Sequence, residues 1–381
     1  MRRTVTRYSF LLALVAALLG FLVAADPARA QDPVVDQPAP PAEAPPASGA
    51  VLEGQLFAGY SYTQADAADF GAFELGRAEA GLRGFWRDRF GLEARLEAIR
   101  SAAPQSTMGI DGDSLVLRVK RAWGHARPTT GTLPTEVRLG LIPDPWVEAV
   151  EEGYSLRPVQ PLLAEFGGFF DASDLGAAAV VGYRDWVRVA AAVTNGEGRR
   201  MIEQNEGKDT SVVLTLKSPS LVLGPLGGHI ARGHVAYRDG SLGPGSAKNS
   251  RLAAAATLDG EVLSLGVEGI QADGIAGDGA RRALGLGAWL SVAPLPPWLS
   301  LFGRYDRIDT DRDMDAASRS LITTGASTAP PLGVPGAWRA FLVLQVERHQ
   351  AQAAPLPGVV DAVDATRVLL VLATSGAWGL R

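Results

Sequence analysis

The sequence predicts an all-β fold, a transmembrane antiparallel β-barrel of about 16 strands. Apolar and polar residues alternate with a period of two over most of the chain from Val51 onward, a pattern typical of half-buried strands. No stretch after residue 30 reaches about 18 consecutive apolar residues, so the sequence offers no transmembrane helix there. Long polar connections and short turns alternate between the strand-like segments, as they do in barrels that cross a membrane.

Residues 1–30 have the features of an export signal. Arg2, Arg3 and Arg7 precede an apolar run over residues 10–25, and Ala28-Arg29-Ala30 has the small-x-small form of a cleavage site. The alternative, an N-terminal membrane anchor, is disfavoured because the apolar run is shorter than about 20 residues. We therefore expect a signal peptide and export from the cytoplasm of a Gram-negative bacterium.

Composition narrows the partners of the exported chain. Loss of residues 1–30 removes four Arg and one Asp, which changes the net charge from −5 to −8. A mildly acidic chain argues against nucleic acid as a partner. The absence of cysteine excludes disulfides and thiolate metal sites, and nothing in the sequence indicates a cofactor.

Residues 31–50 carry six prolines and predict a disordered, partly polyproline II linker, because such a composition cannot bury a core. We expect this linker to be a spacer; peptidoglycan or a periplasmic partner is the alternative. The barrel domain is then expected in residues 51–381.

The alternating pattern predicts fifteen clear strands, fourteen of them at defined positions. Residues 90–98 illustrate the choice between helix and strand: Glu93, Arg95 and Glu97 fall on alternate positions and so share one face of a strand, whereas a helix would scatter them around its circumference. Segments with the same pattern include residues 52–62, 115–123, 137–141, 175–183, 187–193, 212–216, 229–237, 252–258, 262–270, 284–292, 299–305, 338–346 and 366–374.

A weaker sixteenth strand is expected at residues 318–327. The first strand is expected to begin, and the last strand to end, on the periplasmic side of the membrane, which requires an even number of strands. Short turns are expected at residues 86–89, 184–185, 259–260 and 294–297, and longer loops at residues 64–69, 101–113, 143–173, 195–209, 239–248, 272–281 and 309–317. The connection over residues 217–227 is an exception, since it is longer than the short turns around it.

The cost of placing a charge in lipid predicts which face of each strand points inward. A Lys or Arg facing lipid at the membrane centre costs about 2–4 kcal/mol, so we expect the charged faces to line the lumen. That assigns to the interior Arg95, Arg118, Lys120, Arg138, Arg188, Arg232 and Arg304, together with Glu93, Glu97 and Glu268.

Aromatic residues near the strand ends predict two girdles at the membrane surfaces. One girdle lies near the short turns and the other near the long loops; strand-end aromatics of a soluble β-sandwich are the alternative. The residues concerned are Trp86, Trp123, Trp186, Tyr183 and Trp298 at the first, and Tyr60, Tyr62, Tyr237 and Tyr305 at the second.

The loop over residues 143–173 is unusually acidic. Seven acidic residues lie between positions 144 and 174, against one basic residue, Arg157. We expect this loop to fold into the lumen and to narrow it, because carboxylates facing an arginine-lined wall across water concentrate the field; an external, solvated acidic flap is the alternative. The expected constriction has Glu148, Glu151, Glu152 and Arg157 on the loop and Arg95, Arg118, Lys120, Arg138 and Arg188 on the wall.

At these positions the chain resembles the outer-membrane porins of the phosphate-selective O and P type, in the broad sense of that family. The resemblance rests on the strand at residues 137–142 followed by Pro143, on LFGRYDRID at residues 301–309, and on a set of motif residues: Pro145, Trp146, Asp174, Leu175, Gly176, Asn195, Gly196, Glu197 and Gly198.

The resemblance implies a sixteen-stranded, trimeric, passive channel in which the loop after strand five narrows each pore. It also implies outer-membrane lipids and lipopolysaccharide as surroundings, and small hydrophilic or ionic solutes, anions such as phosphate included, as cargo. Two departures stand against a close match: no lysine cluster is present, and the chain ends in Arg381 where such barrels usually have an aromatic residue.

Other classes of function have weaker support. Catalysis lacks a pairing of serine or carboxylate with the four histidines, His125, His229, His234 and His349. The alternating aspartates at positions 309, 311, 313 and 315 have the spacing of a calcium loop, but Met314 stands where the turn glycine is needed. A structural or adhesive barrel without conductance remains the alternative to a channel.

Overall fold

The computed structural model describes residues 48–65, 69–87, 89–100, 115–199, 201, 203–296, 298–313, 318–329, 337–349 and 364–380. The expected signal peptide, most of the proline-rich linker and Asp315 lie outside these residues. Within them, no helix is both long enough and apolar enough to cross a membrane.

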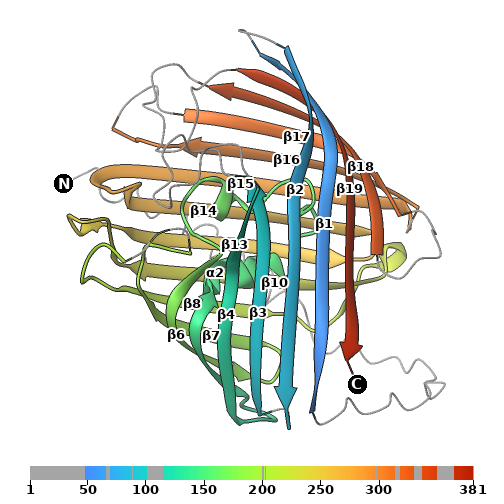
Figure 1. The fold of residues 1–381 in the computed structure, drawn as a ribbon. Coiled ribbons are helices and arrows are strands. Elements are labelled where there is room, and N and C mark those ends of the chain that lie inside the picture. Colours follow the sequence, from blue (N-terminus) through green and yellow to red (C-terminus); the bar gives the residue numbers. More distant parts are fainter. Residues whose placement is uncertain are drawn as a thin grey trace, which may run out of the picture.

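Sixteen antiparallel strands form one closed barrel (Figure 1). They are β1 (Ser48–Ala65), β2 (Asp69–Trp86), β3 (Phe90–Arg100), β4 (Leu115–Thr129), β5 (Thr135–Pro143), β6 (Ser173–Tyr183), β7 (Val187–Thr194), β8 (Asp209–Lys217), β10 (Gly228–Asp239), β13 (Ser250–Gly260), β14 (Leu263–Ile275), β15 (Asp278–Leu295), β16 (Leu299–Asp309), β17 (Ser318–Thr328), β18 (Ala337–His349) and β19 (Ala365–Leu380).

Smaller elements lie in the connections between these strands. A two-residue strand and a 3₁₀ turn follow β8, a small hairpin follows β10, and two short helices lie between β5 and β6. They are β9 (Leu221–Val222), η2 (Gly224–Leu226), β11 (Ser241–Leu242), β12 (Ala247–Lys248), α2 (Pro145–Glu151) and α3 (Leu163–Phe166).

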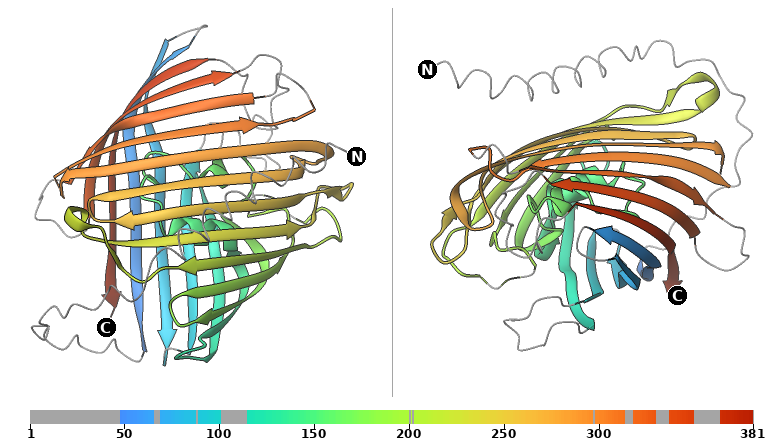
Figure 2. Two further views of the ribbon diagram at one scale, coloured as in Figure 1. Left: turned by 180° about the vertical axis from the view of Figure 1, so that it is seen from behind. Right: turned by 90° about the horizontal axis from the view of Figure 1, so that it is seen from above.

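The barrel closes where the first strand meets the last. β1 pairs with β19 over most of its length, from Ala50 opposite Leu380 to Ala65 opposite Ala365, and with β2 on its other side. Figure 2 shows the resulting wall from behind and from above. Closure leaves no sheet edge with unpaired backbone groups, which is the condition for strands to stand in lipid.

Each predicted strand position overlaps a strand, β17 included, but β2 had been given no position, and three predicted connections are wrong in place or length. Gln64 and Asp69, the bounds of the first expected loop, already pair with each other in β1 and β2. Asp259 and Gly260 belong to β13, so residues 261–262 join β13 to β14.

Residues 272–281 form a tight hairpin, because β14 and β15 continue until only Ala276 and Gly277 remain between them. Both residues have positive φ angles, 54° and 80°, as the favoured two-residue hairpin turns require. The exceptional connection after β8 is a prolonged hairpin, in which β9 pairs with the start of β10.

The two faces of the wall differ as predicted. Leu92, Leu139 and Leu342 are 70%, 70% and 59% exposed and lie on the outward face. Ionisable residues occupy the alternate positions, and Glu79, Lys120 and others there are buried inside the barrel. The apolar outside and charged inside are those of a barrel that stands in lipid and encloses a polar interior.

Trp123 is the exception among the girdle aromatics. Its indole lies inside the barrel, beside Ala178 and Ala192, with the Arg138 guanidinium 4.9 Å from its ring centroid. The cause is a β-bulge in β4: Arg95 pairs with Arg121 and Leu96 with Val119, so Lys120 is an extra residue and the alternation reverses beyond it. The other predicted girdle residues are exposed.

Neighbouring residues at the middle of β1 test the orientation of the wall. Leu56 faces outward and Gln55 inward. We expect Leu56→Arg to lower the free energy of unfolding in a bilayer by about 2–4 kcal/mol, because the charge enters lipid, and Gln55→Arg to lower it by less than about 1 kcal/mol. Urea titration in lipid vesicles measures both; equal losses would contradict the assigned faces.

Candidate functional site

The loop between β5 and β6 begins with a capped helix. The Asp144 side chain accepts hydrogen bonds from the backbone N–H groups of Trp146 and Val147, at 2.9 and 3.2 Å, and Pro145 occupies the first turn of α2. An aspartate cap followed by proline fixes where this helix starts. The helix therefore begins directly after β5, which ends at Pro143.

Apolar packing attaches the loop to the inner wall. The side chains of Trp146, Val147, Leu162 and Leu163 are at most 1% exposed, and they belong to one cluster with inward residues of β13, β14 and β15. Wall glycines make room for the loop: a Cβ at Gly285 would come within 2.6 Å of the Phe169 ring. In Figure 1, α2 accordingly lies among the strands of the barrel.

Hydrogen bonds from distant strands hold the same loop. Trp146 Nε1 donates to Glu268 Oε1 of β14 at 2.9 Å. Gln160 donates to Asp306 of β16 at 3.0 Å and accepts from Thr323 of β17 at 2.9 Å. Each buried polar group gains a partner that water would otherwise supply, so the loop is positioned against strands on several sides.

A buried tyrosine and arginine extend this attachment. Arg304 of β16 donates to the backbone oxygen of Pro161 at 2.8 Å and to the hydroxyl of Tyr154. Burial raises the pKa of Tyr154 to about 12, so its hydroxyl stays protonated at physiological pH and itself donates to the oxygen of Gln160 at 2.9 Å.

Two of the five predicted wall cations contact the acidic loop directly. Arg138 Nη1 and Arg188 Nη2 lie 2.8 and 3.0 Å from Glu148 Oε2, and Arg188 Nη1 lies 3.0 Å from Glu152 Oε1. Burial opposes ionisation of Glu148, but the two guanidinium groups outweigh it and hold its pKa below the usual range. The loop is thus ion-paired to β5 and β7.

Arg157 is paired within the loop. Its guanidinium lies 3.0 Å from Glu151 and donates two hydrogen bonds to Glu165. Burial disfavours the charged guanidinium, yet these carboxylates raise its pKa above the usual value. The single cation of the loop is therefore permanently charged and fixed in direction.

The other three predicted wall cations are paired with carboxylates of the wall itself. Lys120 lies 2.6 Å from Glu79, Arg118 lies 2.6 Å from Glu97, and Arg95 bridges Glu53 and Glu79. These pairs form a strip of alternating charge over β1 to β4, which we call the charged strip. It is defined by Glu53, Arg77, Glu79, Arg95, Glu97, Arg118, Lys120 and Arg121.

Two cations of the charged strip were not predicted. Arg121 lies 3.9 Å from Glu151 of the loop, and Arg77 lies 3.2 Å from Glu79. Arg121 could not be identified by strict alternation, because the bulge at Lys120 turns it inward. Arg77 alternates with Glu79 along β2, so a signal for it was present in the sequence.

The motif residues gather at the base of the loop. Asp174 accepts hydrogen bonds from the backbone N–H groups of Leu175 at 2.7 Å and Gly196 at 2.6 Å. Glu197 accepts from Gly243 N and Asn205 Nδ2, at 2.9 and 3.0 Å. The motif therefore joins β6, the β7–β8 loop and the β10–β13 loop.

Backbone geometry explains the glycines of the motif. Gly196 and Gly198 have φ angles of 96° and 72°, in the left-handed region that glycine adopts without strain. A Cβ at Gly176 would come within 2.2 Å of the Val193 backbone oxygen. Asn195 N donates to the oxygen of Leu175 at 3.0 Å, while Pro145 and Trp146 begin α2, so the motif is structural in its contacts.

The described parts of the chain contain no group of three or more His, Asp or Glu residues arranged to hold a metal ion. Asp313 is paired with Arg282, and Asp309 accepts from the backbone of Asp311. His234 lies 3.0 Å from Thr215 and contacts the edge of the Trp146 ring, whereas His229 lies against the backbone oxygen of Gly227.

Comparison with known proteins gives matches among solved structures. No family model matches the chain, and no curated protein matches it. An anion-selective porin from Comamonas acidovorans superimposes with a TM-score of 0.58 at 15% identity, over 86% of this chain and 99% of that chain.

Outer-membrane expressed OmpT of Vibrio cholerae gives a TM-score of 0.53 at 10% identity, over 87% and 98% of the two chains. A variant of OmpT that lacks loop L8 gives 0.52 at 12% identity, over 87% of this chain and 100% of that chain. At such identities the likeness concerns the fold: this chain is folded as a complete barrel similar to those of outer-membrane porins.

Proposed function

We propose that this protein is a porin, a passive water-filled channel for small hydrophilic or ionic solutes in the outer membrane of a Gram-negative bacterium. The observation that carries the proposal is the acidic loop fixed against the inner wall by Arg138 and Arg188. The anion-selective porin of similar fold supports the same class of function. In this proposal outer-membrane lipids and lipopolysaccharide surround a homotrimer.

The narrowest part is proposed between the loop and the charged strip. Arg157 and residues 158–161 line a cavity of about 190 Å³ together with Arg77 of β2 and residues of β1 and β19, so the loop reaches across to that side. Glu151 approaches Arg121 at 3.9 Å. Opposed charges close to a narrow aqueous path act most strongly on passing ions, because the surrounding wall has a low dielectric constant.

The charge arrangement favours weak selectivity. Every cation of the charged strip has a carboxylate partner, as in the pairs Lys120–Glu79 and Arg118–Glu97. Paired charges leave a small net field, while their dipoles still orient water and polar solutes. Anions such as phosphate belong to the proposed cargo without being its exclusive members.

Planar-bilayer conductance of the refolded mature chain tests the proposal. We expect discrete conductance steps, grouped in threes for a trimer, and a reversal potential in a salt gradient that reports the sign of selectivity. A correctly folded barrel that gives no steps would overturn the proposal in favour of a structural or adhesive barrel.

The triple variant Glu148→Gln, Glu151→Gln and Glu152→Gln tests the loop side of the constriction. Its removal of three negative charges releases Arg188 from Glu148 and Glu152, and Arg138 from Glu148, while Arg138 keeps its pair with Glu136. We expect the cation-to-anion permeability ratio to fall by about threefold or more, as expected for a field of order kT at a narrow site, and we would measure it by reversal potential.

The matched control carries Glu203→Gln, Glu206→Gln and Glu261→Gln, which remove three exposed carboxylates outside the lumen loop. We expect the control to behave as the unmodified protein. An equal shift of the permeability ratio in both triple variants would mean that overall charge causes the effect. The assignment of the loop to the constriction would then be wrong.

The lowered pKa of Glu148 predicts resistance of the constriction to acid. A carboxylate whose folded-state pKa is depressed keeps its charge, and its stabilising ion pairs, as pH falls toward the usual glutamate pKa of about 4.3. We expect the contribution of Glu148 to selectivity, measured as the difference between the unmodified protein and Glu148→Gln, to stay constant from pH 7 to about pH 5 and to fall only below about pH 4.3. A transition near neutral pH would contradict this assignment.

A further inference from the structure

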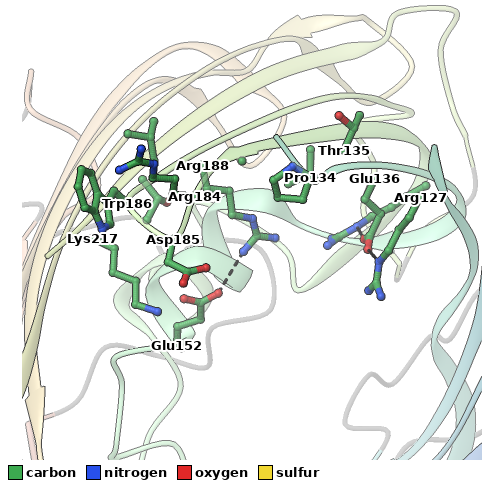
Figure 3. A pocket seen from close by; sticks show the side chains of 15 residues that line it. Arg127, Pro134, Thr135, Glu136, Glu152, Arg184, Asp185, Trp186, Arg188 and Lys217 are labelled. Carbon is green, nitrogen blue, oxygen red and sulfur yellow. Dashed lines mark hydrogen bonds and ion pairs between the residues drawn. The ribbon is translucent and has the colours of Figure 1, made fainter. Parts of the chain in front are cut away.

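A cavity of about 380 Å³ opens beside the loop at the short-turn end of the barrel (Figure 3). Strands β4 to β8 and their turns supply most of its lining, and Glu152, just after α2, supplies the rest. Pro134, Val180 and Val187 give it apolar surface. Its volume falls in the range of sites that hold small molecules.

The charges in this cavity divide into paired and unpaired groups. Arg127 and Arg138 are paired with Glu136, and Arg188 with Glu152. Three further charged side chains have no ion pair or hydrogen bond with any other described side chain: Arg184, Asp185 and Lys217. Figure 3 shows Lys217, Asp185 and Glu152 directed into the same space.

Cations outnumber carboxylates in the lining. Five basic residues line the cavity: Arg127, Arg138, Arg184, Arg188 and Lys217. The acidic ones are Glu136, Glu152 and Asp185. An occupant with net negative charge fits this excess, whereas the unpaired Asp185 carboxylate adds a place for a positive group.

Backbone hydrogen bonds hold the main chain at two of these residues, Arg184 and Lys217. Arg184 has a φ angle of 49°, in the left-handed region that a residue with a Cβ adopts only when its surroundings enforce it. Its N–H donates to the oxygen of Thr132 at 2.8 Å, and Lys217 N donates to the oxygen of Trp186 at 2.7 Å. The Arg184 guanidinium lies over Tyr183 and Trp186, so this one of the three unpaired side chains is already oriented before binding.

We propose that this cavity is a binding site for small amphoteric organic anions, of which acidic amino acids are the simplest. Lys217, with Arg184 at the rim, binds the carboxylates, and Asp185 binds the ammonium group. The proposal rests on the proposed channel function, because the site then meets solutes on the short-turn side of the loop, next to the Arg188–Glu152 pair.

Isothermal titration calorimetry on the folded, detergent-solubilised barrel tests the site with two probes, L-aspartate and succinate, which differ by the ammonium group. We expect Lys217→Gln to raise the Kd of both probes, and Asp185→Asn to raise the Kd of L-aspartate alone, by about tenfold in each case, the change typical of one charge-assisted hydrogen bond. Controls are Lys208→Gln and Glu261→Gln, which remove one charge each outside the cavity and should leave both constants unchanged.

Two other outcomes would overturn the proposal. If Lys217→Gln binds both probes with unchanged Kd, the cavity is not their binding site. If Asp185→Asn binds L-aspartate as tightly as the unmodified protein does, the cavity does not recognise the ammonium group and the proposed class of ligand is wrong. Potassium chloride conductance of the same samples separates the two proposals: normal conductance without aspartate binding rejects the site alone, whereas binding without conductance rejects the channel alone.

Discussion

Closure of β1 onto β19 is the constraint on which the rest of the structure depends. In lipid, every strand needs hydrogen-bonded neighbours on both sides, and a closed sheet provides them without an edge. Closure gives each strand one face toward lipid and one toward the interior. The apolar side chains then have to be outside and the ionisable ones inside, and the inner charges have to find partners in a confined volume, as Lys120 does with Glu79.

The interior satisfies this requirement differently on its two sides. Over β13 to β15 many of the inward positions are small or apolar, such as Ala253, Ala255 and Gly285, and the loop covers them with Leu163 and Phe169. The inward carboxylate of Glu268 accepts a hydrogen bond from Trp146 of the same loop. Over β1 to β4 the inward positions carry the charged strip, which is neutralised largely within the wall. The side formed by β13 to β15 therefore packs against the loop, while the side formed by β1 to β4 retains the polar surface that a water-filled path needs.

The fold was largely predictable because a period of two persists through strands of any length, and lipid exposure enforces it. The predictions that were wrong concern local features of single strands and turns. The bulge at Lys120 has no signature in the residue pattern, yet it turned Trp123 and Arg121 inward, and the turn at Ala276 and Gly277 was hidden by polar residues that belong to longer strands. In the candidate site, residue types were predictable, but ion-pair partners depend on strand neighbours and on the path of the loop. Hence Arg138 and Arg188 meet the loop, whereas Arg95, Arg118 and Lys120 do not.

Glu152 links the two proposed sites. Its carboxylate is 3.0 Å from Arg188, which also holds Glu148, and it lines the cavity that contains Lys217. A change of charge at Glu152 therefore alters the field on both sides of the loop. Neutralising it leaves Arg188 with one carboxylate partner, Glu148, in place of two, and makes the cavity more attractive to anions. The same change weakens the acidic face of the constriction. Selectivity at the loop and affinity in the cavity are thus coupled through one ion pair, and Glu148, which shares Arg188 but does not line the cavity, provides the means to separate them.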